Sequence, residues 1–136
     1  MMEKTIYLIR HGNVDKNIDH TKLTTSGNEF AENLPQLLNN LKINFIASVK
    51  EKQRCKDTVN KLSETNNLKI IEYDKIDFLF LKPYYEALKY NTSVICYGVE
   101  EISEIFKLFS IEINKENKDS FYHKIIQITI DENYNN

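Results

Sequence analysis

The chain contains 136 residues, of which 41% are hydrophobic, and this size and apolar content suit one globular domain with a single core. Its 18 basic and 20 acidic residues leave a formal net charge of −2, which excludes a global field that attracts nucleic acid or an anionic membrane surface. We therefore expect one domain over residues 1–136, with residues 131–136 as a frayed tail, and an anion to be bound by local groups.

The N-terminus and the cysteines indicate a cytoplasmic protein. The chain enters a short apolar run directly, without a signal-peptide core or the roughly 18 apolar residues of a membrane span. Cys55 and Cys96 cannot form a disulfide framework, so we expect two free thiols packed inside. The three histidines and two cysteines match no tight metal-ligand spacing, and the chain lacks a P-loop motif. We expect no metal and no cofactor.

The first half of the chain predicts two strands, each followed by a helix. Residues 5–9 and 45–48 are short apolar runs without alternation, as is typical of parallel strands covered on both faces. A capping cluster at residues 24–26 precedes the first helix, which Pro35 should kink or interrupt. The apolar stripe of this helix is Phe30, Leu34, Leu37, Leu38 and Leu41. The stripe of the second helix is Cys55, Thr58, Val59 and Leu62.

The second half predicts further strands and helices. Residues 69–73 form a strand, Pro83 starts a short helix through Lys89, and residues 93–97 form a third central strand. A helical stripe follows at Ile102, Ile105, Phe106 and Phe109. After a polar loop over residues 114–119, residues 125–130 alternate as a half-exposed edge strand does.

This order of elements predicts a three-layer α/β/α sandwich with a mostly parallel central sheet. Ligands of such sheets bind at the carboxyl ends of the strands. Arg10, His11 and Gly12 follow the first strand at such an end. A neutral imidazole can attack phosphorus, and a guanidinium can hold phosphate oxygens in a bidentate fork. The alternative is a surface Arg-His pair that closes the strand.

Four segments, in chain order, resemble motifs of the histidine phosphatase superfamily, whose fold is phosphoglycerate-mutase-like. Residues 6–12 resemble its opening strand and nucleophile loop, and residues 23–27 resemble the start of its first helix. Residues 47–48 followed by residues 54–58 are similar to its second helix entry, with a slightly longer loop. Residues 94–98 resemble its last central strand and Ser-His-Gly. The chain's three glycines all fall at glycine positions of these motifs: Gly12, Gly27 and Gly98.

The resemblance covers roughly residues 4–130 and makes this chain a short member of the family. It implies that His11 is the phosphoacceptor and that Arg10 and Arg54 clamp the phosphate. It also implies that Asn17 orients the phosphate, because this residue falls at the family's usual phosphate-side asparagine.

Two positions depart from the family pattern. Tyr97 stands where the family has a second histidine, so it is either a neutral hydrogen-bond donor to phosphate or ordinary packing at a strand end. Lys75 stands where the family has a glutamate as general acid. An alternative register places Glu72 there, and Asp74 or Asp77 can also approach. For each of these acids, a solvated surface role is the competing interpretation.

The other two histidines have separate expectations. His20 lies in the loop that borders the pocket in the family, where it either replaces the missing cation or serves no pocket role. His123 precedes the final strand and is expected on the surface, with a role in the pocket as the alternative.

These residues predict a phosphatase of the histidine phosphatase type, weak or specialised, that transfers a phosphoryl group through His11. One alternative is a catalytically inactive phosphate- or phosphoprotein-binding module of the same fold. Another is a domain with a vestigial pocket that serves protein contact. The expected ligand is a phosphate-bearing small molecule or a phosphoprotein, with no nucleic-acid and no membrane partner. The sequence does not specify the substrate or the oligomeric state.

Overall fold

In a computed structural model, which describes residues 3–15, 17–108 and 122–131, five strands form one sheet in the order β5-β4-β6-β1-β7. The strands are β1 (Glu3–Arg10), β4 (Phe45–Val49), β5 (Ile70–Tyr73), β6 (Thr92–Tyr97) and β7 (Ile125–Asp131). The first four of these run parallel, and β7 pairs with β1 in the antiparallel direction. The structure therefore confirms the mostly parallel sheet.

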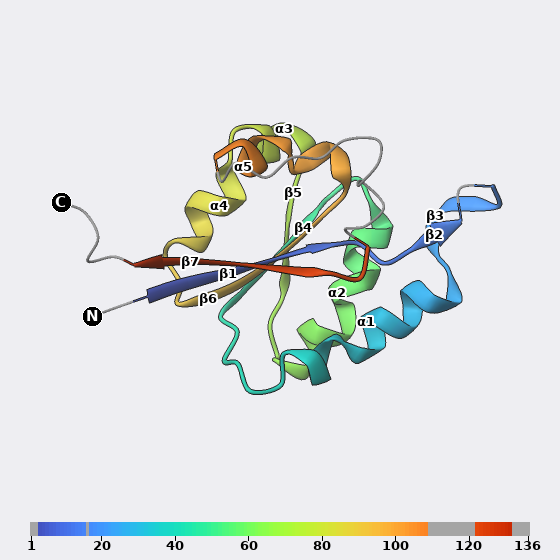
Figure 1. Cartoon of the computed structure of the whole chain (residues 1–136), viewed down its shortest axis with the longest axis horizontal. Helices are drawn as coiled ribbons and strands as arrows, with labels where there is room; N and C mark the ends of the chain where they lie inside the picture. Colours follow the sequence, from blue (N-terminus) through green and yellow to red (C-terminus); the bar gives the residue numbers. More distant parts are fainter. Residues whose placement is uncertain (1–2, 16, 109–121, 132–136) are drawn as a thin grey trace.

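Helices cover both faces of this sheet, as Figure 1 shows. One face carries α1 (Thr25–Leu37) and α2 (Gln53–Thr65). The other face carries α3 (Lys75–Leu79), α4 (Lys82–Ala87) and α5 (Ser103–Leu108). This arrangement confirms the α/β/α sandwich.

The core lies between the sheet and these helices because the central strands are apolar on both faces. Every residue of β4 is buried, and so is β1 from Ile6 to Arg10. Cys55 on α2 and Cys96 on β6 are free, fully buried thiols. The two cysteines are therefore packed inside, as the sequence predicts.

Some local structure differs from the sequence-based expectation. The loop after His11 contains a hairpin of β2 (Val14–Asp15) and β3 (Asp19–Leu23), whose polar residues carry no strand signal. The helix α3 was not predicted either, although Asp74 caps it by accepting a hydrogen bond from the Asp77 N–H. A short 3₁₀ turn, η1 (Val99–Glu101), follows β6.

Other expectations concern single positions. Pro35 lies in the last turn of α1, which ends at Leu37, so the proline falls close to the end of the helix rather than dividing it. Phe109, the loop over residues 114–119 and the tail from residue 132 lie outside the described residues. Within the described part of the chain, no helix has the length and apolar character needed to cross a membrane.

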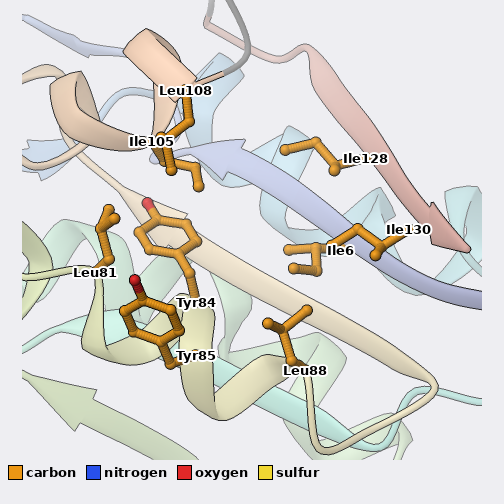
Figure 2. A pocket seen from close by; sticks show the side chains of 9 residues that line it. All are labelled: Ile6, Leu81, Tyr84, Tyr85, Leu88, Ile105, Leu108, Ile128 and Ile130. Atoms are coloured by element: carbon orange, nitrogen blue, oxygen red, sulfur yellow. The ribbon is translucent and has the colours of Figure 1, made fainter. Parts of the chain in front are cut away.

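A pocket between α4, α5, β1 and β7 is lined almost entirely by carbon (Figure 2). Its lining residues are Ile6, Leu81, Tyr84, Tyr85, Leu88, Ile105, Leu108, Ile128 and Ile130. None of these side chains carries a charge, so this pocket cannot be the phosphate site that the sequence predicts. The charged candidates lie at the carboxyl ends of β1, β6 and β4.

Candidate active site

The candidate active site forms where β1 and β6 end side by side. Arg10 pairs with Tyr97 as the last residues of the two strands, and the His11 N–H donates to the Tyr97 carbonyl at 3.0 Å. Because β6 lies between β1 and β4, the loop that leads from β4 into α2 reaches the same edge of the sheet. Residues far apart in the sequence therefore meet around His11.

His11 is buried between polar partners, and their geometry specifies its tautomer. Its Nε2 lies 3.1 Å from Nε of Arg54, which can only donate, so Nε2 accepts this hydrogen bond. The proton is therefore on Nδ1, which lies 2.8 Å from the Gly12 carbonyl and donates to it. This arrangement directs the lone pair of Nε2 toward the guanidinium of Arg54.

The charge state of His11 follows from the same surroundings. Burial, with smaller contributions from the positive charges of Arg54 and Arg10, lowers the pKa of His11 from 6.5 to about 4 against the raising effect of the Gly12 carbonyl. His11 is thus a neutral imidazole near pH 7. Neutrality is the state in which an imidazole can act as a nucleophile.

Thr58 ties the loop of His11 to the helix of Arg54. Its Oγ1 accepts a hydrogen bond from the Gly12 N–H at 2.8 Å and donates to the Arg54 carbonyl at 2.7 Å. In the sequence, Thr58 is predicted only as a member of the buried stripe of the second helix. It is also the last residue of the second-helix motif, and this position is the feature of the sequence that could have indicated a positioning role.

The loop after His11 also packs directly on the start of α1. A Cβ on Gly27 would lie 2.5 Å from the Asn13 carbonyl oxygen, and a Cβ on Gly12 would lie 2.8 Å from the Gly27 oxygen. Thr24 caps the helix by accepting from the Gly27 N–H, and its own N–H donates to the Asn13 carbonyl. Glycine is therefore needed at both positions for the two backbones to touch.

Arg10 lies beside His11 and beneath an aromatic ring. The Cζ atom of Arg10 lies 3.7 Å from the ring centroid of Tyr122, a cation–π distance. The same ring lies 5.7 Å from the His11 ring, at 58°. Arg10 is 5% exposed and His11 is 3% exposed. The sequence analysis missed Tyr122, which no motif or periodicity singles out.

His123 fastens the Tyr122 turn to the active site. Its Nε2 accepts a hydrogen bond from the Asn13 N–H at 3.0 Å, and its ring stacks on Phe30 at 4.7 Å. Burial lowers the pKa of His123, which favours the neutral form that this acceptor role needs. The expectation of a surface histidine is corrected here, because the antiparallel pairing of β7 with β1 delivers this residue to the site.

The structure buries Tyr97 almost completely, at 1% exposure, with its ring edge-on to Phe106. Its hydroxyl has no hydrogen-bond partner among the described residues. Burial raises the pKa of Tyr97, so the phenol stays protonated near pH 7. This geometry favours the packing interpretation over contact with phosphate.

The remaining candidate residues lie apart from His11, or outside the part of the chain that the structure describes. Asn17 is exposed in the turn between β2 and β3, where its N–H donates to Asp15. Glu72 lies on β5, separated from β1 by β4 and β6, and pairs with Lys56 at 3.2 Å. The side chain of His20 lies outside what the structure describes.

Lys75, where the family has its acid, begins α3 and lies 3.5 Å from Glu100. The site thus unites Arg10, His11 and Arg54. The structure does not bring Glu72 to them, while Asn17 as a phosphate ligand stays a prediction. In residues 3–15, 17–108 and 122–131, no group of three His, Cys, Asp or Glu side chains could hold a metal ion.

The mostly parallel sheet, with a buried imidazole at its carboxyl edge that accepts a hydrogen bond from a guanidinium group, is the arrangement expected of a phosphoglycerate-mutase-like protein. The sequence profile described as "Histidine phosphatase superfamily (branch 1)" matches residues 6–77, which is just over half of the chain. The chain therefore belongs to the histidine phosphatase superfamily. No curated protein sequence matches it.

Solved structures agree on the fold. A mycobacterial glucosyl-3-phosphoglycerate phosphatase superposes with a TM-score of 0.69 at 14% identity, over 93% of this chain and 90% of that chain. A putative α-ribazole-5'-P phosphatase from Escherichia coli gives a TM-score of 0.67 at 16% identity, over 95% and 91%. A phosphoglycerate mutase from Plasmodium falciparum gives 0.59 at 19% identity, over 98% and 86%. At these identities, the likeness shows the fold alone.

Proposed function

We propose that this protein is a phosphatase that transfers a phosphoryl group first to Nε2 of His11 and then to water. The observation that carries the proposal is the neutral, buried imidazole whose Nε2 lone pair faces the guanidinium of Arg54. In the first step, a phosphate oxygen replaces Nε2 as the acceptor of the Arg54 N–H, which frees the Nε2 lone pair to attack phosphorus. The bond to the leaving oxygen breaks, with its electron pair going to that oxygen. In the second, water attacks phosphorus, the P–N bond breaks, and inorganic phosphate leaves.

Arg54 and Arg10 hold the phosphate in this proposal. Arg54 already lies at hydrogen-bond distance from the attacking atom, so its fork meets any oxyanion that approaches Nε2. The Tyr122 ring covers one face of the Arg10 guanidinium, and this contact orients a group whose N–H bonds lie in its own plane. Asn17 would join them from the hairpin turn.

The departures from the family pattern lower the expected rate. A preorganised donor contributes roughly 10² to 10³ in rate, and a general acid contributes roughly 10² to 10⁴. Tyr97 and Lys75 stand where the family places these groups. We therefore propose weak or specialised catalysis, fastest on activated esters whose leaving oxygen needs no proton.

The test is turnover of p-nitrophenyl phosphate, phosphohistidine and small phosphoesters by the purified chain. His11→Ala and Arg54→Ala should each reduce kcat/KM by a factor of roughly 10² or more, since each removes a group that acts on the transition state. Lys61→Met, on the exposed face of α2, is the matched control and should leave turnover unchanged. Turnover that persists in His11→Ala would overturn the mechanism.

One observation favours a second candidate function, a module that binds phosphate without cleaving it. His11 and Arg10 are 3% and 5% exposed, and the Tyr122 ring lies against both. Tight binding of vanadate or phosphate in a calorimeter, with no turnover over the whole substrate panel, would establish this function. In either case, the proposed ligand is a phosphate-bearing small molecule or a phosphoprotein. The cytoplasmic location stays a prediction.

A further inference from the structure

Lys52 is a buried lysine beside the candidate active site. It precedes α2 as its N-cap residue, and its side chain is only 7% exposed. Its Nζ lies 2.9 Å from Oε1 of Glu100 and 3.0 Å from Oε1 of Glu101. Glu101 is itself 1% exposed at its side chain, whereas Glu100 is 70% exposed. Lysines are rarely buried in proteins unless they are paired, and here two carboxylates pair with the ammonium group.

The ammonium group of Lys52 lies over the end of β6. A Cβ on Gly98 would collide with Nζ, which shows how closely the ammonium approaches this backbone. Gly98 directly follows Tyr97, whose carbonyl accepts the His11 N–H. Since β6 separates β4 from β1 in the sheet, Lys52 extends from the loop after β4 across β6 toward His11.

The surroundings hold this ammonium in place and leave part of it available. Glu101 Oε1 also accepts a hydrogen bond from the Gly98 N–H at 2.9 Å, so one carboxylate fixes Nζ and the strand end together. An ammonium has three donors, and the two glutamates use two of them. The described residues supply no acceptor for the third N–H of this ammonium. The positive charge of Lys52 also makes the smallest of the contributions that lower the pKa of His11.

We propose that Lys52 is an anion-binding residue of the phosphate site and supplies, from the loop before α2, the positive charge that Tyr97 does not carry. The inference rests on the proposed phosphate site around His11. It adds a third cation to Arg10 and Arg54, on the side of the site where β6 ends. A tetrahedral dianion between Nε2 of His11 and Gly98 would then meet cations from β1, α2 and the loop before α2.

The test is calorimetric binding of vanadate and of inorganic phosphate to the full chain. Lys52→Met should weaken binding about 10- to 100-fold, because a charge-assisted hydrogen bond to the anion is lost. Lys52→Arg retains the charge and should restore most of the affinity. Lys61→Met removes the same charge from an exposed position on α2 and should change affinity less than twofold. Equal affinities for Lys52→Met and Lys61→Met would overturn the proposal.

Removal of Lys52 leaves Glu101 buried without its cation, so the Met variant can fail to fold. Glu100→Gln avoids this problem because that side chain is exposed. It frees Lys52 from one of its two carboxylates, and it should tighten vanadate binding about threefold. An unchanged affinity in Glu100→Gln would count against the proposal, because a Lys52 ammonium that contacts the anion should bind it more tightly when one of its carboxylates is neutralised.

Failure of this inference is distinguishable from failure of the proposed function. If Arg54→Ala loses vanadate binding while Lys52→Met and Glu100→Gln behave as wild type, the phosphate site stands and Lys52 is not part of it. If wild-type protein binds neither vanadate nor phosphate, both proposals are overturned.

Discussion

On one side of His11, the strand β1 and the helices α1 and α2 are joined by short hydrogen bonds and by backbone contact between Gly12 and Gly27. On the other side, at the end of β6, lie the buried phenol of Tyr97 and the ion pairs of Lys52 with Glu100 and Glu101. The first side preserves the family motifs and the second departs from them. The position of His11 and the positive charge around it therefore depend on separate parts of the fold.

The reason for this separation is geometric. As the proposed nucleophile, His11 must be positioned to within a fraction of an ångström, so the hydrogen bonds that position it have to be kept together. A positive charge acts over a longer range and can be delivered by any side chain that reaches the same volume.

The largest expected effect is the pH dependence of the nucleophile side. The unfolded chain binds a proton on His11 below about pH 6.5, while the folded chain does so only below about pH 4. Stability should therefore fall as pH falls through this window, by up to about 3 kcal/mol from His11, and should level off below it. Urea unfolding of wild type and His11→Gln across pH 4 to 7 isolates this contribution.

His123, whose pKa burial also lowers, contributes in the same direction in both proteins and cancels in this comparison. An identical pH dependence in His11→Gln would show that the His11 pKa is not depressed. If His11 is the nucleophile, the acid limb of kcat/KM should also have its midpoint near pH 4.

A smaller effect is expected from Thr58→Val, which keeps the shape of the side chain and removes its hydroxyl. The Gly12 N–H then loses its acceptor, which should cost about 1 to 3 kcal/mol of stability. Turnover should fall as well, because the loop of His11 loses its link to Arg54. Thr65→Val, exposed at the end of the same helix, is the matched control for urea unfolding. Equal losses in the two variants would remove the positioning role of Thr58.

The smallest expected effect on binding belongs to Tyr97, the last residue of β6. Tyr97→Phe removes a buried hydroxyl that has no partner among the described residues, so stability should rise by about 1 kcal/mol. Vanadate affinity should not change. Tyr84→Phe, which removes another such hydroxyl from α4, should behave in the same way. A tenfold loss of affinity in Tyr97→Phe alone would show that Tyr97 is a phosphate ligand after all.

Much of the fold follows from local patterns in the sequence. The apolar runs that predict β1, β4 and β6 are buried as expected, and so is the stripe on α2. On α1, Phe30 and Leu34 are buried, whereas Leu37 at the end of the helix is exposed and Leu41 lies beyond it. Hydrophobic periodicity reports which side of an element is covered, so these elements could be found without coordinates. The hairpin of β2 and β3 and the short helix α3 could not, because polar and very short elements carry little periodic signal.

The residues of the candidate site likewise divide into those that the sequence predicts and those that only the structure reveals. By itself, the sequence determined Arg10, His11 and Arg54, since each lies in a motif at the end of a strand or the start of a helix. Only the tertiary structure decided that the Tyr122 ring covers Arg10 and that Lys52 lies over Gly98. Such contacts join residues that are distant in the chain, and they depend on the order of strands in the sheet and on how loops extend over its edge. Neither property is encoded in the spacing of residues along one segment.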